Sequence, residues 1–202
     1  RCLGHYMAPL DGGAYVDIVL NGDVHTHNQQ AMGVATRPKA KETMYAFLYG
    51  SGNEKLGAII GKDERAGGLL KRKLLKALPA LAELLKDVKK QSKQHSSLVA
   101  LDGRIVLSRS DHSALNLLMQ STGAILMKKA TVLLMAEIRR RGIDAKLVLH
   151  VHDEVQLEVR EDQAELVGKL AVRAMVLAGQ EFNLDCPMDG EYKVGNNWAE
   201  TH

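Results

Sequence analysis

The chain has 202 residues, 46% hydrophobic and 25% charged, which suffices for one compact unit or two small packed ones and excludes a disordered chain. Cys2 and Cys186 lie at opposite ends without a C-x-x-C pair, and no run of about 18 apolar residues occurs, which excludes a disulfide framework, a thiolate zinc site and a membrane helix. The net charge of +3 is uneven, because residues 37–93 hold 14 Lys/Arg against 6 Asp/Glu; such a basic lobe either attracts a polyanion or is a solvated surface.

The expected secondary structure combines helices with two hairpins. In chain order the elements are a helix begun by Thr36 and stopped at Gly50-Ser51-Gly52, a lysine-rich amphipathic helix pair broken near Pro79, a hairpin over residues 98–107, a long apolar helix over residues 110–141, a hairpin over residues 146–159, a helix over residues 162–178, and a short strand near Tyr192. Thr36 is a preferred N-cap, and Pro38 is tolerated in the first turn that follows it. Asp102-Gly103 is a typical hairpin turn, and Gly142 ends the long helix.

Four residues recur at intervals of four on the helix that follows Thr36: Arg37, Lys41, Tyr45 and Tyr49. At about 100° per residue each step drifts by only about 40°, so the four share one face of the helix. Two cations followed by two aromatic rings suit a nucleoside triphosphate, whose phosphates meet the cations while a ring borders the sugar or the base. The alternative is a solvated basic turn followed by two tyrosines packed into a core.

Two adjacent carboxylates, Asp153 and Glu154, lie at the turn of the second hairpin. A turn breaks the alternation of side chains along a strand, so both carboxylates can approach one cation, and an oxygen-rich site of this kind prefers magnesium. The alternative is an ordinary polar hairpin tip. His150 and His152 suggest a zinc hydrolase as a second interpretation of this segment. The H-x-H-x-D spacing is not met, because Asp153 follows His152 directly, and the H-E-x-x-H motif is absent.

A third set of polar residues, His112, Asn116 and Gln120, forms one stripe on a helix that is otherwise rich in Leu, Ala and Met. Asn and Gln carry donors and acceptors, which suits base edges in the minor groove, where every base pair presents acceptors. The alternative is a set of capped or networked polar groups within a core.

These three patterns resemble motifs of the family A (polymerase-I-like) DNA polymerases, in wording and in order. Residues 36–50 are similar to motif B, the R-x3-K-x3-Y/F-x3-Y-G signature of the fingers helix, and residues 151–154 to motif C. His112, Asn116 and Gln120 resemble the polar residues of the primer-template helix. Residues 1–7 resemble the segment directly after the motif A aspartate, and residues 22–26 resemble the segment before the fingers helix. The resemblance covers essentially the whole chain and is closer to phage replicative polymerases than to bacterial repair enzymes, in which arginine often stands at the position of His112.

For the nucleotide, the resemblance implies roles for five side chains. Arg37 and Lys41 would hold the triphosphate, and Lys41 would also protonate or neutralise the departing pyrophosphate. His25 would touch the outer phosphate. Tyr45 would lie against the incoming sugar, and Tyr49 would stack at the template base just ahead of insertion.

For the metal and the DNA, the resemblance implies a second group of residues. Asp153 would coordinate two magnesium ions together with the motif A aspartate, Glu154 would support that site, and His152 would steady the primer end. The DNA-binding residues would be Tyr49, His112, Asn116 and Gln120. The implied reaction is in-line attack of a primer 3′-hydroxyl on the α-phosphorus of a deoxynucleoside triphosphate, with two metal ions about 4 Å apart.

The implied fold is of the α+β class, a right-hand polymerase fold with helical fingers and a palm that contains an antiparallel sheet, truncated at its N-terminus. We expect residues 1–20 to be a palm remnant that follows motif A, residues 21–110 to form the fingers, and residues 111–202 to form the palm with the motif C hairpin. The motif A aspartate and the thumb are expected upstream of Arg1, so the chain alone is expected to be inactive.

The implied partners are primer-template DNA, deoxynucleoside triphosphates, and either the missing N-terminal part as a separate chain or a processivity factor, with no membrane. The expected location is the cytoplasm of a bacterial or phage-infected cell. A non-catalytic nucleic-acid-binding module, or one subunit of a split polymerase, remains as the alternative.

Overall fold

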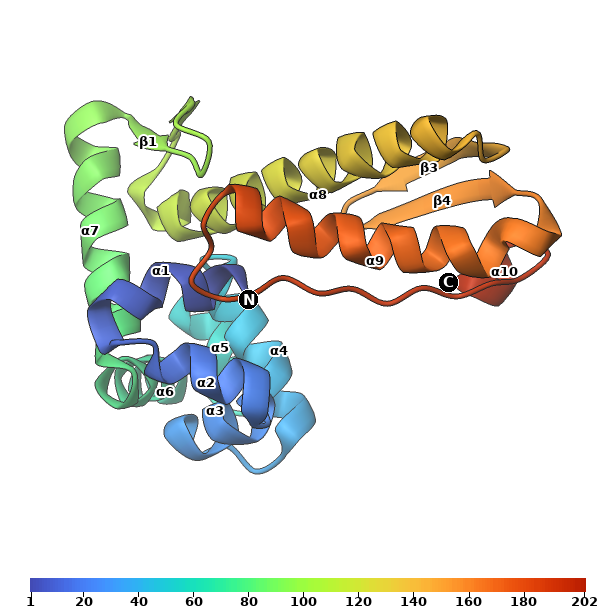
Figure 1. The fold of residues 1–202 in the computed structure, drawn as a ribbon. Helices are drawn as coiled ribbons and strands as arrows, with labels where there is room; N and C mark the ends of the chain where they lie inside the picture. The colour runs from blue at the N-terminus through green and yellow to red at the C-terminus, as the bar shows by residue number, and fades with distance from the viewer. The chain divides into compact units, whose positions relative to one another are not determined.

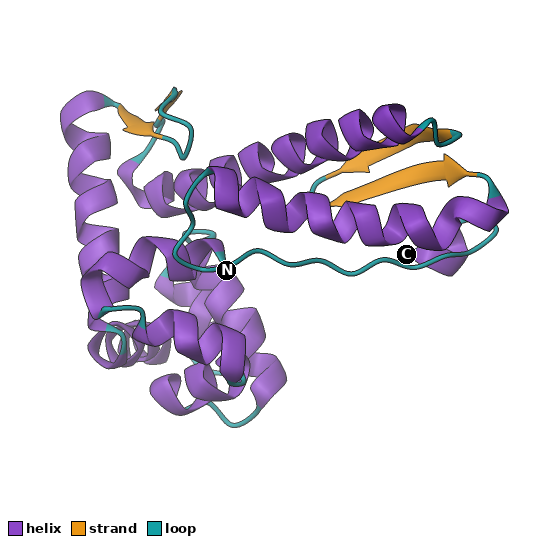
Figure 2. Cartoon of the chain, viewed as in Figure 1, coloured by secondary structure: helices purple, strands orange, loops and turns teal.

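The structure, a computed structural model, describes the whole chain, residues 1–202 (Figures 1 and 2). It is mostly helical and contains two separate two-stranded antiparallel sheets. The chain divides into two compact units, Arg1–Gln120 and Ser121–His202. None of the helices is both long enough and apolar enough to cross a membrane.

The first unit consists of helices and one small hairpin. Its elements are α1 (Cys2–Asp11), α2 (Ala14–Asn21), α3 (Val24–Met32), α4 (Arg37–Leu48), α5 (Asn53–Ile59), α6 (Glu64–Ala77), α7 (Pro79–His95), β1 (Ser97–Val99), β2 (Ile105–Leu107), the 3₁₀ turn η1 (Asp111–Ser113) and the first turns of α8 (Ala114–Arg141). Its core takes buried side chains from α1 through the start of α8, among them Met7, Met32, Leu56, Leu74, Leu81 and Leu115.

Local signals in the sequence explain where several of these elements begin and end. The side chain of Thr36 accepts a hydrogen bond from the backbone N–H of Lys39, and proline lies in the first turn of α4, as predicted. Pro79 begins α7, and Gly103 has a φ of 82° in the turn between β1 and β2. The predicted helix after Thr36, the lysine-rich helix pair and the first hairpin are confirmed.

The second unit packs two long helices with a hairpin. It contains the remainder of α8, then β3 (Ala145–Val151), β4 (Glu154–Val159), the 3₁₀ turn η2 (Glu161–Gln163), α9 (Ala164–Glu181) and α10 (Trp198–Thr201). Strands β3 and β4 are antiparallel, with a register shift between Leu147 and Leu149. Side chains from α8, α9 and both strands share one core, which includes Leu134, Ile138, Leu157, Val167 and Leu170. The predicted long helix, the second hairpin and the helix after it are confirmed.

The predicted strand near Tyr192 is wrong. Residues 183–197 form an extended segment without a strand partner, and it runs beside α9 (Figure 1). The Tyr192 ring covers Gly168 of α9, where a Cβ would clash with it, and the Tyr192 hydroxyl donates to Glu165 at 2.7 Å. Side-chain contacts with a helix therefore hold this segment, whereas a strand would need backbone hydrogen bonds to a neighbouring strand.

Candidate nucleotide site and carboxylate turn

The predicted stripe on α4 faces solvent. Arg37, Lys41 and Tyr45 are exposed on α4, and Tyr49, the residue after its last turn, is also exposed. The opposite face of the helix is buried through Ala40, Thr43, Met44, Ala46 and Phe47. Tyr45 and Tyr49 are 46% and 54% exposed, so the alternative of two tyrosines packed into a core is wrong. The cations and the rings are available to a ligand on one face.

Asp23, the N-cap of α3, connects that helix to the stripe. Its carboxylate accepts from the backbone N–H groups of His25 at 3.0 Å and Thr26 at 3.3 Å, and from the Thr26 hydroxyl at 2.7 Å. The same carboxylate accepts from Arg37, with Nε at 2.7 Å and Nη2 at 3.1 Å. The hydrogen bond from Arg37, followed by that from the Thr26 hydroxyl, lowers the pKa of Asp23 well below its usual range. No role was predicted for Asp23, although an Asp two residues before the predicted phosphate ligand His25 is a common N-cap signal.

His25 lies beside the stripe on α4. Its ring centroid is 6.5 Å from that of Tyr45, and the two rings are inclined by 51°. Its Nδ1 is buried and has no hydrogen-bond partner. Burial, and then the positive charges of Arg37 and Lys41, lower the pKa of His25, while Asp23 opposes them. The sequence-predicted triphosphate residues of the two helices are thus brought together in the first unit.

A buried polar pair lies in the same unit and was not predicted. Asn28, one turn after His25 on α3, is 1% exposed, and its Nδ2 donates to the Tyr15 hydroxyl at 3.3 Å. Burial raises the pKa of Tyr15, against the effect of the hydrogen bond from Asn28. The pair joins positions 13 residues apart on α2 and α3, and a single sequence carries no periodic signal for such a contact.

The polar stripe of His112, Asn116 and Gln120 also lies in the first unit. His112 belongs to η1, whereas Asn116 and Gln120 belong to α8. His112 and Gln120 are exposed, and the Oδ1 atom of Asn116 is buried without a partner, so a fully satisfied core network is not found. Gly50, which follows α4, has a φ of 78°, and a Cβ there would lie 3.0 Å from the carbonyl oxygen of His112. This close backbone approach places the end of α4 against the start of the polar stripe.

The carboxylate turn belongs to the second unit. Val151 pairs with Glu154, so His152 and Asp153 form the turn between β3 and β4, and His152 adopts a φ of 51°. Asp153 is exposed and makes no hydrogen bond or ion pair. It is therefore the free carboxylate of the turn.

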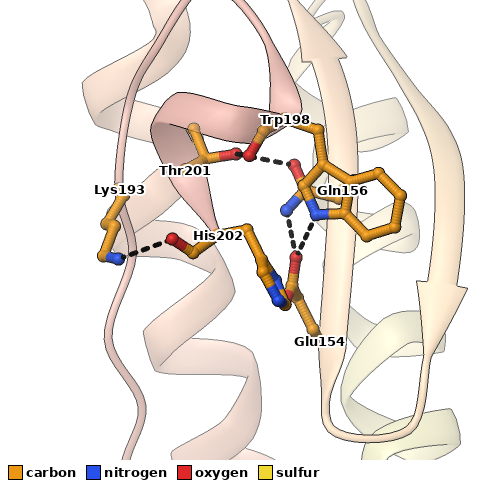
Figure 3. A network of polar contacts seen from close by, with 6 residues as sticks. All are labelled: Glu154, Gln156, Lys193, Trp198, Thr201 and His202. Carbon is orange, nitrogen blue, oxygen red and sulfur yellow. Dashed lines mark hydrogen bonds and ion pairs between the residues drawn. The ribbon is translucent and has the colours of Figure 1, made fainter.

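Glu154, in contrast, is held by the C-terminal residues (Figure 3). Its carboxylate accepts from Trp198 Nε1 at 2.9 Å, from the His202 ring at 2.9 Å and from the Gln156 amide. These donors, Gln156 first, lower the pKa of Glu154. Thr201 donates to Gln156 at 3.2 Å and adds a further connection between α10 and β4.

Magnesium prefers oxygen ligands, which makes the exposed carboxylate of Asp153 a suitable donor. Oε1 of Glu154 accepts from Trp198 and Gln156, whereas Oε2 accepts only from His202 and keeps one acceptor site. No group of three or more His, Cys, Asp or Glu side chains is arranged to hold a metal ion. The donor type fits magnesium, but the turn supplies only part of a ligand set.

The fold is similar to that of the POL domain of Pol1 from M. smegmatis, solved in complex with DNA primer-template and dNTP. The TM-score is 0.78 at 21% sequence identity, over 94% of this chain and 37% of that one. This likeness defines the fold, that of a polymerase domain with a mostly helical part and small antiparallel sheets. The predicted fold class is confirmed.

The family model of DNA polymerase family A matches residues 19–200, and the chain belongs to this family. It is 40% identical, over its full length, to the DNA-directed DNA polymerases of Enterobacteria phage T3 and Escherichia phage T7. It is 30% identical, over 81% of its length, to DNA polymerase I of Aquifex aeolicus. The predicted phage-like family A assignment is confirmed. The chain spans 32%, 32% and 30% of the lengths of these three relatives.

Proposed function

We propose that this chain is the nucleotide-binding and metal-binding part of a template-directed DNA polymerase, which transfers a nucleotide from a deoxynucleoside triphosphate to a primer 3′-hydroxyl. The observation that carries the proposal is the cluster of Arg37, Lys41, His25 and Tyr45, in which two cations, an imidazole and an exposed ring from two helices face the same region. Membership of DNA polymerase family A supports it.

Within this cluster, the guanidinium of Arg37 donates to phosphate oxygens, and the ammonium of Lys41 neutralises or protonates the departing pyrophosphate. His25 contacts the outer phosphate. Tyr45 lies against the sugar, and Tyr49 stacks at the template base. Lys41 makes no ion pair, so its charge is available to a polyanion.

Asn116 and Gln120 recognise minor-groove acceptors, which tests the shape of a base pair rather than its sequence, and His112 contacts the DNA at the start of this stripe. Asp153, with Glu154 in support, would hold magnesium together with a motif A aspartate supplied from outside residues 1–202. Bound magnesium ions would lower the pKa of the primer hydroxyl and stabilise charge on the phosphates. His152, beside Asp153 in the turn, steadies the primer end.

We assign residues 1–20 to a palm remnant, 21–110 to the fingers and 111–202 to the palm. The partners are primer-template DNA and deoxynucleoside triphosphates, with the remaining polymerase polypeptide or a processivity factor as a protein partner. The location is the cytoplasm of a bacterial or phage-infected cell. The support for these assignments is the family membership and the likeness to phage enzymes.

Binding measurements on the 202-residue chain test the assignment of the two stripes. Lys41→Ala should weaken the binding of a fluorescent dATP analogue roughly tenfold or more, because a charge-assisted contact is lost. Asn116→Ala and Gln120→Ala should weaken binding of a primer-template duplex and leave nucleotide binding unchanged. Lys90→Ala, which removes an equal charge from the exposed face of α7, is the matched control and should leave nucleotide binding unchanged.

Two results would contradict this assignment. Equal effects of Lys41→Ala and Lys90→Ala on nucleotide binding would mean that the chain attracts polyanions without a defined site. An effect of Lys41→Ala on duplex binding alone would favour a non-catalytic nucleic-acid-binding module.

A further inference from the structure

One carboxylate, that of Asp23, accepts hydrogen bonds from two helices of the first unit. Three of its donors belong to the first turn of α3, namely the backbone N–H groups of His25 and Thr26 and the hydroxyl of Thr26. The other two are Nε and Nη2 of Arg37, at the start of α4. Because α3 fixes the carboxylate independently of Arg37, Asp23 serves as a fixed reference for the guanidinium.

The ion pair leaves most of the guanidinium free. Arg carries five N–H donors, and the bidentate contact with Asp23 uses two of them, on the edge that contains Nε. The remaining N–H groups are available on the other edge of the same plane. A bidentate contact fixes the orientation of that plane, so Asp23 determines the direction in which Arg37 presents its free donors.

The same carboxylate also determines where α3 begins. Hydrogen bonds from the backbone of residues two and three positions later are those of an N-cap, and they fix the first turn of the helix, which carries His25. His25 and Arg37 therefore depend on a single side chain for their placement. The two residues are 12 positions apart in the sequence and lie on different helices, so no local interaction along the chain couples their orientations.

We propose that Asp23 is a positioning residue of the triphosphate site, orienting Arg37 and His25 together through one carboxylate. This inference rests on the proposed function. The contrary role is that of a competitor, in which Asp23 occupies Arg37 and has to be displaced by the triphosphate. The two roles predict opposite effects of removing the charge of Asp23.

Asp23→Asn separates them, because asparagine remains a good N-cap but lacks the charge and the second acceptor oxygen for Arg37. In the 202-residue chain, we expect the affinity for a fluorescent dATP analogue to fall about three- to tenfold. We also expect the Nε–H resonance of Arg37 to broaden or disappear in the NMR spectrum. In an Arg37→Ala background, Asp23→Asn should cause a smaller loss of affinity than in the unmodified chain.

Asp63→Asn is the matched control. Asp63 is the exposed N-cap of α6, accepts from the backbone N–H of Ala66 at 2.9 Å, and has no cationic partner. The same substitution there changes the charge equally and should leave both the nucleotide affinity and the Arg37 resonance unchanged.

The outcomes separate the two proposals. Unchanged dATP affinity in both Arg37→Ala and Lys41→Ala would overturn the triphosphate site, and the positioning role with it. Loss of affinity in those two variants, together with unchanged or increased affinity in Asp23→Asn, would overturn the positioning role alone.

Discussion

His25 lies where positive side chains outnumber negative ones, and this determines how its charge responds to pH and to a ligand. Burial, Arg37 and Lys41 lower its pKa, and Asp23 opposes them. A lowered pKa means that the unfolded chain binds this proton more readily than the folded chain. The resulting stability is therefore present above the ordinary histidine pKa of about 6.5 and is lost as the pH falls through the lowered value.

A bound triphosphate should reverse the shift at His25. Its negative charge would offset the charges of Arg37 and Lys41, so we expect the pKa of His25 to rise when dATP is added. An NMR pH titration of the imidazole, with the resonance assigned through His25→Gln, measures this directly. A pKa that does not change at saturating dATP would place the phosphates away from His25.

The sequence predicted which side chains of α4 share one exposed face better than it predicted which residues of other helices contact them. The stripe of Arg37, Lys41 and Tyr45 follows from helical spacing alone, and its exposure in the structure agrees with that interpretation. The contact between Asp23 and Arg37 joins positions 14 residues apart, across the turn between two helices. Periodicity describes one helix at a time, so it cannot show which residue of another helix completes an ion pair.

At the level of elements, the crossing of α5 and α6 depends on two glycines. A Cβ at Gly67 of α6 would lie 2.6 Å from the backbone N of Gly57 and would also clash with the carbonyl oxygen of Asn53. A Cβ at Gly57 would clash with the carbonyl oxygen of Asp63. The obstructing atoms belong to backbone, which a rotamer change cannot move, so the two helices approach closely only because both residues lack a side chain.

Gly67→Ala should therefore destabilise the chain by about 1–3 kcal/mol, the usual range for overpacking. Gly68→Ala changes its neighbour on α6, where a Cβ would meet only side-chain atoms at ordinary contact distances, Asn53 at 3.5 Å and Arg72 at 3.9 Å. That variant should be neutral or more stable by about 0.5–1 kcal/mol, because alanine has the higher helix propensity. Urea denaturation of both variants measures the difference. Equal denaturation midpoints would show that α5 and α6 can separate at little cost.

Local signals predicted α4, the α6–α7 pair, both hairpins, α8 and α9, whereas α1, α2, α3, α5 and α10 were not predicted. A tertiary contact explains why the predicted strand near Tyr192 is wrong. Thr36, Gly103 and Gly142 act through their own backbone or cap, so their effects can be recognised in a single sequence. The segment around Tyr192 was predicted to be a strand. In the structure the Tyr192 ring packs on Gly168 of α9, where the missing side chain of glycine leaves room for it. Which surface an extended segment meets is decided by the rest of the fold.

On the scale of the whole molecule, positive charge is concentrated in the first unit and the carboxylate turn lies in the second. Residues 37–93 carry a local charge of +8, whereas the rest of the chain sums to −5. Two magnesium ions that lie close together need several anionic oxygens as ligands. This turn offers one free carboxylate, that of Asp153. Under the proposed function, a magnesium site at this turn would need a further carboxylate to complete its ligand set.

We expect the purified 202-residue chain to show no primer extension in magnesium. Adding a polypeptide that carries the family's motif A aspartate, in cis or as a separate chain, should restore template-dependent extension. Asp153→Ala should then reduce the restored activity by roughly 100-fold or more, the scale of losing a group that stabilises transition-state charge. Glu158→Ala, which removes an exposed carboxylate from β4 away from the turn, is the control and should retain the activity. Extension by the unsupplemented chain that Asp153→Ala abolishes would show instead that residues 1–202 contain a complete metal site.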